Sequence, residues 1–129
     1  MIKFKENKLI KKIIISTLVL MTMFAVVAPV ANTQTVAASV TSNKKAVDTL
    51  AKKKYHWNKT QIKYLHKVIK YESGWKLNAR NGQYYGLFQT TNVRDKSAKG
   101  QAKQGLKYIH SRYGKPSGAW AHIKSYRWY

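Results

Sequence analysis

The chain has 129 residues, with 25 Lys and Arg against four Asp and Glu, so its formal net charge is +21 at neutral pH. It contains no cysteine, which excludes disulfide staples and thiolate metal ligands. A charge of this size attracts polyanions, but by itself it does not distinguish nucleic acid, anionic membrane and anionic cell wall.

The first 38 residues follow the order of a secretory signal. Five lysines before residue 13 precede the apolar stretch Ile13–Val27, and small residues then lead to Ala38. We expect cleavage after Ala38, with Ala31 as the second choice, and hence a secreted or cell-wall-associated protein without a stable membrane span. An uncleaved anchor is the alternative, although Ile13–Val30 barely reaches the roughly 20 apolar residues that a span needs.

Residues 39–129 are long enough for one small domain, which we expect to function as a monomer. We divide them into a basic lead-in and helix over 39–56 and a main domain over 57–129. They keep 20 of the cationic side chains and three acids, Asp48, Glu72 and Asp95, which is a formal charge of +17. All four Trp and all nine Tyr lie after residue 54, so aromatic packing is expected to form much of the core.

Two helices are predicted in the first half of this domain. Ser39–Asn43 is small and polar and is interpreted as a flexible lead-in, after which Lys44–Lys54 shows one apolar face. In the second helix, Asn58 and Gln61 have the spacing of a capping box, and Gly74 is suited to end it. Its apolar stripe consists of Ile62, Leu65, Val68 and Ile69.

Glu72 lies at the end of this stripe and is the only glutamate after the leader. At about 100° per residue, it projects about 20° from Leu65 and about 40° from Val68, on the side that faces the core. Burial and the negative end of the helix dipole both disfavour its ionised form, so we expect its pKa to be raised. The alternative is a structural glutamate that pairs with one of the many cations.

The second half is predicted as a polar loop region and two helices. Leu77–Arg94 has no helical period, and Gln83–Gln89 within it is interpreted as a short strand or hairpin arm. Ser97–Tyr113 reads as a helix that Gly100 and Gly105 weaken by about 1 kcal/mol each. Pro116 then opens a last helix, Ser117–Tyr126. The fold class is therefore mainly α, with a short β-hairpin near the site.

No cofactor or metal site is expected. The histidines show no ligand spacing, and we interpret His66 as an exposed helix residue and His122 as a contact between helices. No phosphate-binding loop is present, and neither is a nucleic-acid motif. Nucleic acid is therefore not the expected partner.

The aromatic side chains allow two interpretations. Trp75, Tyr84, Tyr85 and Phe88 could line a cleft and stack on sugar rings, or they could form the core. For Trp120 and Trp128, the core is the favoured interpretation.

The number of carboxyl groups limits the chemistry of Glu72. Glycosidases normally place a second carboxyl about 5–9.5 Å from the first, and neither Asp48 nor Asp95 has the surroundings of a nucleophile. If Glu72 acts on sugars, it acts alone, first as acid and then as base, and the substrate supplies the nucleophile.

The motifs around Glu72 resemble those of the lytic transglycosylase family, which has a lysozyme-like fold. Glu72-Ser73-Gly74-Trp75 is similar to the family's catalytic Glu-Ser-Gly-aromatic motif, and Gly86-Leu87-Phe88-Gln89 is similar to its Gly-Leu-Met-Gln segment. Further matches resemble the C-terminal domain of aggregation-promoting-factor-type surface proteins of lactic acid bacteria, so the likeness covers about residues 57–129. They are Asn78-Ala79, Gly105–Ile109, Arg112–Gly114, Ala119–His122 and Trp128-Tyr129. Ala119–His122 departs from the Ala-Tyr-Asn-Ala-Gly segment that is typical of lytic transglycosylases.

The resemblance implies cleavage of peptidoglycan glycan strands between N-acetylmuramic acid and N-acetylglucosamine, with an anhydromuramyl product. It makes Glu72 the general acid/base and Ser73 the residue that orients Glu72 or the substrate. It places Gly86 and Gln89 along the sugar cleft, and we add the neighbouring Phe88 and Tyr84 as substrate-binding residues.

Two other functions compete with this one. A non-catalytic cationic protein that binds anionic cell-wall polymers or promotes aggregation fits the charge of +17 and the altered Ala119–His122 segment. A cationic membrane-active protein would use the helix over 44–54, but it needs no aromatic-rich domain.

Overall fold

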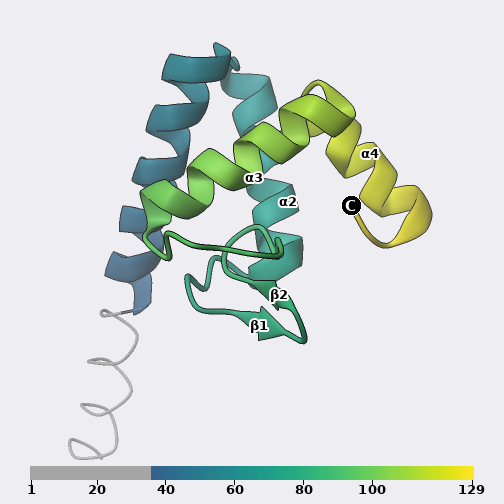
Figure 1. The fold of residues 1–129 in the computed structure, drawn as a ribbon. Coiled ribbons are helices and arrows are strands. Elements are labelled where there is room, and N and C mark those ends of the chain that lie inside the picture. The colour runs from purple at the N-terminus through teal and green to yellow at the C-terminus, as the bar shows by residue number, and fades with distance from the viewer. Residues whose placement is uncertain (1–35) are drawn as a thin grey trace, which may run out of the picture. The chain divides into compact units, whose positions relative to one another are not determined.

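Four helices and one small hairpin make up residues 36–129, the part of the chain described by the computed structural model (Figure 1). A helix over residues 36–55 precedes the labelled elements. These are α2 (Lys59–Ser73), β1 (Arg80–Asn81), β2 (Tyr84–Tyr85), α3 (Ala98–Tyr113) and α4 (Pro116–Tyr126). The mainly α fold with a short hairpin is therefore confirmed. The predicted signal up to residue 35, with the second cleavage site at Ala31, lies outside the described residues, whereas Ala38, the preferred site, lies within the helix over residues 36–55.

The helix over residues 36–55 is longer than the sequence predicted. Ser39–Asn43, expected as a flexible lead-in, is helical. Asn43 is buried, and its side-chain amide donates a hydrogen bond to the backbone oxygen of Trp75 at 3.2 Å. One and two turns later, Val47 and Ala51 are fully buried in the core. The lead-in prediction was wrong because a polar side chain with a buried partner can face the core as well as an apolar one.

Helix α2 begins and ends where the sequence predicted. The Asn58 side chain accepts a hydrogen bond from the Gln61 backbone N–H at 3.0 Å, and Gly74 ends the helix in the left-handed conformation with φ 58°. The Gln61 side chain does not complete a capping box, because its oxygen accepts from the Ser117 N–H at 3.0 Å. Gln61 thus caps α4, whose own N-cap residue Lys115 makes no side-chain hydrogen bond.

Helices α3 and α4 complete the core around α2. Helix α4 packs against both α2 and α3, and Figure 1 shows it on the side opposite the helix over residues 36–55. Gly105 lies where a Cβ would come within 2.1 Å of the Phe88 ring, so this glycine, expected only to weaken α3, lets Phe88 pack against it. The core is a single cluster that draws apolar side chains from all four helices of the described residues.

The hairpin lies at the C-terminal end of α2 (Figure 1). Its strands are antiparallel, with Arg80 opposite Tyr85 and Asn81 opposite Tyr84, and Tyr85 also bridges to Thr90. Strand structure covers only two residues of the predicted Gln83–Gln89 arm, because the chain turns back after Tyr85. Within residues 36–129, no helix combines the length and the apolar character that crossing a membrane requires.

Candidate functional site

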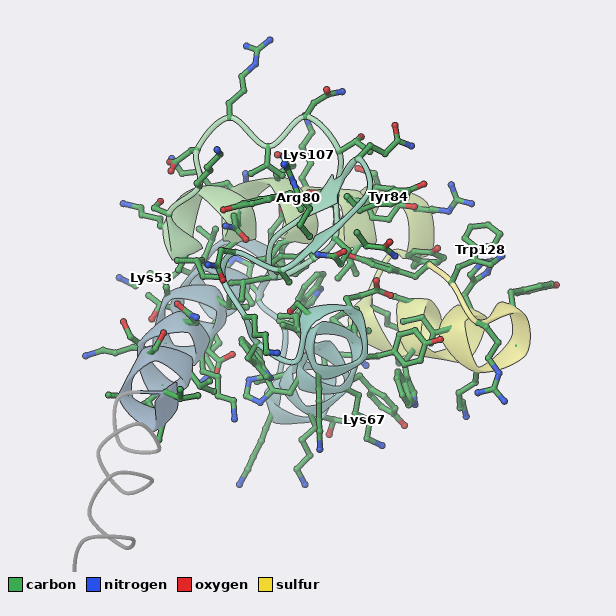
Figure 2. All side chains as sticks on the ribbon, turned by 90° about the horizontal axis from the view of Figure 1, so that it is seen from below. Lys53, Lys67, Arg80, Tyr84, Lys107 and Trp128 are labelled. Carbon is green, nitrogen blue, oxygen red and sulfur yellow. The ribbon has the colours of Figure 1, made fainter. Side chains whose placement is uncertain are left out.

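Glu72 lines a cleft of about 780 Å³ between the end of α2, the hairpin and the segment after α4. In Figure 2, Arg80 and Tyr84 mark the hairpin side and Trp128 marks the segment after α4. Three cationic side chains, Lys76, Arg80 and Arg127, also line the cleft. The other lining residues are Tyr71, Ser73, Ala79, Asn81, Tyr84, Gln89, Trp128 and Tyr129.

The Glu72 carboxyl is half-buried and has no ion-pair partner among residues 36–129. Loss of water around it raises its pKa from 4.5 to about 7. The sequence predicted this upward shift of the pKa, and burial of the carboxyl is its cause. At neutral pH a large fraction of Glu72 therefore carries a proton, as a general acid requires.

Ser73 connects the end of α2 to the segment Gly86–Gln89. Its hydroxyl lies 3.1 Å from the backbone oxygen of Ile69 and 2.9 Å from that of Leu87, and it shares its one hydrogen between them. The residue is buried. Ser73 therefore positions the backbone beside Glu72. Its hydroxyl hydrogen is already donated to backbone oxygens of the protein.

Gln101 of α3 holds the same segment from the other side. Its buried side-chain oxygen accepts from the Leu87 N–H at 2.7 Å. Its amide nitrogen donates to the backbone oxygens of Leu77 at 2.9 Å and Lys96 at 2.8 Å. A Cβ on Gly86 would lie 2.0 Å from the Gln101 oxygen, and the φ of Gly86 is 80°. Glycine is needed at position 86 so that Gln101 can reach Leu87.

Gln89 presents one polar group to the cleft. Its amide nitrogen donates to the backbone oxygens of Ala79 at 3.2 Å and Gly86 at 2.9 Å. Within the described part of the chain, its side-chain oxygen accepts no hydrogen bond, so it is available to a hydroxyl or amide N–H of a ligand. Gln89 has a φ of 47°, which keeps it in the tight turn after Gly86.

The segment after α4 forms the opposite wall. The Tyr129 hydroxyl donates to the Phe88 backbone oxygen at 2.6 Å, and the Tyr71 hydroxyl donates to the Arg127 oxygen at 3.0 Å. Burial of its hydroxyl, followed by the charge of Glu72, raises the pKa of Tyr129 well above its ordinary value. Tyr129 therefore stays a neutral hydrogen-bond donor near Glu72. Trp128 is 51% exposed at the cleft, so its predicted place in the core was wrong.

Two predicted substrate-binding residues do not reach the cleft. Phe88 is 1% exposed and belongs to the core, because its ring packs against Gly105 of α3. Gly86 is buried and contributes its backbone to the turn. Trp75, considered as a sugar-stacking residue, is also in the core. Tyr84, 45% exposed, does line the cleft, as do Ser73 and Gln89.

The cations and the segment after α4 were missed by sequence reasoning. Lys76, Arg80 and Arg127 carry no motif that separates them from the other basic residues. Tyr129 was visible only as part of the Trp128-Tyr129 match, which says nothing of Glu72. Tyr71 was visible only as the neighbour of Glu72.

Neither of the other two acids after the leader lines the Glu72 cleft. Asp48 lies 2.8 Å from the Nε2 of His66, a residue that is partly buried rather than exposed as predicted. The His66 ring also packs edge-on against the Trp75 ring, with ring centres 5.0 Å apart. Asp95 accepts from the Ser97 N–H at 3.0 Å, at the start of α3. His122 contacts Tyr113 of α3 with ring centres 5.3 Å apart, which confirms the predicted contact between helices.

Among residues 36–129, no cluster of three His, Asp or Glu side chains could hold a metal ion. The arrangement around Glu72 is that of one carboxyl able to give and take a proton, with neutral donors, acceptors and cations around it. Neither a protein-family model, nor a curated protein, nor a solved structure matches the chain.

Proposed function

We propose that the chain is an exported, cell-wall-associated lytic transglycosylase that cleaves peptidoglycan glycan strands. The observation that carries the proposal is the state of Glu72. Its carboxyl is half-buried in a cleft, unpaired among the described residues, and has a pKa of about 7. A glutamate held for structure would have a cation or a hydrogen-bond donor to satisfy it.

The chemistry needs one carboxyl group. Protonated Glu72 gives its proton to the glycosidic oxygen as the bond from that oxygen to C1 of the muramyl ring breaks. The ionised carboxylate then takes the proton of the muramyl 6-hydroxyl, whose oxygen bonds to C1 and closes the anhydro ring. Glu72 ends protonated, and no water is consumed.

The positions of the other acids support this route over hydrolysis by two carboxyl groups. A glycosidase that uses water or a covalent intermediate places its second carboxyl about 5–9.5 Å from the first. Asp48 is held by His66, and Asp95 is held at the start of α3. Neither lines the cleft of Glu72.

The remaining lining residues suit a glycan with acidic substituents. Tyr84 and Trp128 expose ring surface that can stack on sugars, and the free oxygen of Gln89 can accept from an acetamido N–H. Lys76, Arg80 and Arg127 can pair with the carboxylates of lactyl or peptide substituents. The Tyr129 hydroxyl donates its hydrogen to the Phe88 backbone oxygen, so near Glu72 it stays neutral and its own oxygen can accept a hydrogen bond.

Digestion of purified cell wall tests the proposal. We expect wild-type protein to release anhydromuropeptides, which mass spectrometry separates from hydrolysis products because they are lighter by one water molecule. Glu72→Gln should lose this activity by a factor of at least about 100, the usual contribution of a general acid. Asp48→Asn makes the same carboxyl-to-amide change outside the cleft and should keep it. Absence of anhydro products from the wild type would reject the enzyme.

A non-catalytic wall-binding or aggregation-promoting protein is the second candidate. The formal charge of +17 on residues 39–129 and the cations along the cleft favour it. In that case neither the wild type nor Glu72→Gln cleaves glycan, and both bind wall equally and lose binding in salt.

A further inference from the structure

A second groove, of about 550 Å³, lies between the helix over residues 36–55, the loop before α3, and α3 itself. Four cationic side chains line it: Lys54, Arg94, Lys103 and Lys107. It shares no lining residue with the Glu72 cleft. The rest of its lining is Leu50, Asn92, Asp95, Gly100 and Gln104.

Asp95, the one acid in this groove, is already hydrogen-bonded within the protein. Asp95 accepts from the Ser97 N–H at 3.0 Å, and its pKa is lowered first by its hydrogen bonds with Ser97 and then by nearby Lys103 and Lys99. A Cβ on Gly100 would lie 2.0 Å from the Asp95 carboxyl carbon, so the carboxyl packs directly on the first turn of α3. Four cations against one acid leave the groove with an excess of three positive charges.

Two of the four cations, Lys103 and Lys107, belong to α3. Lys103 and Lys107 are one turn apart on the same face of α3, which separates them by about 6 Å along the helix axis. Lys54 and Arg94 come from the two flanking segments. Several cations gathered in one groove suit a flexible chain that carries one negative charge per repeating unit.

The groove lacks what single-stranded nucleic acid uses. Among the described residues that line it, none is aromatic, whereas proteins that bind single strands stack bases on aromatic rings. The aromatic surface lies in a third hollow, of about 410 Å³, which includes Tyr84, Tyr108 and Trp128. That hollow shares Gln104 with the cationic groove, and it shares Tyr84, Gln89, Trp128 and Tyr129 with the Glu72 cleft. The aromatic hollow therefore adjoins the Glu72 cleft, and Gln104 borders both the aromatic hollow and the cationic groove.

We infer that the groove lined by Lys54, Arg94, Lys103 and Lys107 binds a linear polyol-phosphate polymer of the cell wall. Phosphodiesters pair with the cations, and the polymer needs no ring stacking. The inference rests on the proposed wall location but not on catalysis by Glu72.

Binding of a fluorescent poly(glycerol phosphate), measured at several salt concentrations, tests the inference. The groove variant is Arg94→Gln/Lys103→Gln/Lys107→Gln. The control variant, Lys59→Gln/Lys63→Gln/Lys115→Gln, removes the same charge from exposed sites outside the groove. We expect the groove variant to lose at least about tenfold in affinity. The slope of log affinity against log salt should become shallower by about 2, because each of the three lost phosphate contacts contributes about 0.7. The control should lose less than about threefold.

Two further arms separate the alternatives. Arg94→Lys/Lys103→Arg/Lys107→Arg should keep the affinity, which excludes a folding defect as the cause of the loss. An oligothymidylate with the same number of phosphates should bind more weakly than poly(glycerol phosphate). Equal losses in the groove and control variants, or tighter binding of oligothymidylate through the groove, would overturn the inference. Wall digestion by the wild type tests the enzyme separately. If the wild type releases no anhydro products while only the groove variant loses affinity for the polymer, the enzyme is rejected and the inference stands.

Discussion

The Ser73 hydroxyl lies 2.9 Å from the backbone oxygen of Leu87, so the residue next to Glu72 is bonded to the turn that carries Gln89. The backbone N–H of Leu87 donates a hydrogen bond to the side-chain oxygen of Gln101 at 2.7 Å. Leu87 is thus held through both backbone groups, once from α2 and once from α3. This arrangement holds the end of α2, which carries Glu72, against the turn that carries Gln89.

Removal of the Ser73 hydroxyl should destabilise the domain. Ser73→Ala leaves the buried Leu87 oxygen without its donor, which costs about 1–3 kcal/mol of unfolding free energy. Urea unfolding measures this cost. Ser125→Ala, at an exposed position of α4, should stay within about 0.5 kcal/mol of wild type. Unchanged stability of Ser73→Ala together with lost wall cleavage would instead make Ser73 a substrate-binding residue.

Replacement of Glu72 should stabilise the protein at high pH and not at low pH. The folded-state pKa of about 7 lies above the 4.5 of the unfolded chain, so the folded state binds more protons between these values and loses stability as pH rises through them. Glu72→Gln removes this loss. We expect a gain of about 1–2 kcal/mol above pH 7, less than the full shift implies because the carboxyl is half-exposed. Below pH 4.5 the variant and wild type should unfold alike in urea, and a gain of equal size at both extremes would contradict the raised pKa.

The pH profile of wall cleavage should have one limb. The free enzyme must hold a proton on Glu72, so kcat/KM should fall as pH rises, with a midpoint near 7. No second carboxylate has to be ionised, so no loss is expected on the acidic side at the ordinary pKa of an aspartate. Initial rates of anhydromuropeptide release measure the profile. A bell-shaped curve would point to a second titrating group and a hydrolytic mechanism.

Gly105→Ala should destabilise the protein even though alanine favours helices. The gain in helix propensity is about 1 kcal/mol, but the new Cβ would meet the Phe88 ring at 2.1 Å. Overpacking of this kind costs about 1–3 kcal/mol, so we expect a net loss in urea unfolding. Ser111→Ala, at an exposed position of the same helix, should be neutral or slightly stabilising. A stabilised Gly105→Ala would mean that Phe88 can move away without cost.

Local patterns account for what could be predicted around Glu72. The cap at Asn58 and the left-handed Gly74 set the two ends of α2, and the apolar stripe ending in Ile69 set the side on which Glu72 projects. Each of these features depends on residues within one or two turns, so no distant partner is needed to identify it. The same patterns misjudged Asn43, because its partner Trp75 lies 32 residues away.

The sequence by itself determined helices α2, α3 and α4, the excess of positive charge and the lone glutamate on the inward face of α2. Only the tertiary structure decided what surrounds that glutamate. Phe88 turned inward because Gly105 leaves room for its ring, and Trp128 stayed at the cleft beside Tyr129. Tyr129 reaches the Phe88 backbone across 41 residues of sequence. Contacts of that separation form only when whole elements pack together, because the shape and desolvation that select them belong to the assembled core and not to any local run of residues.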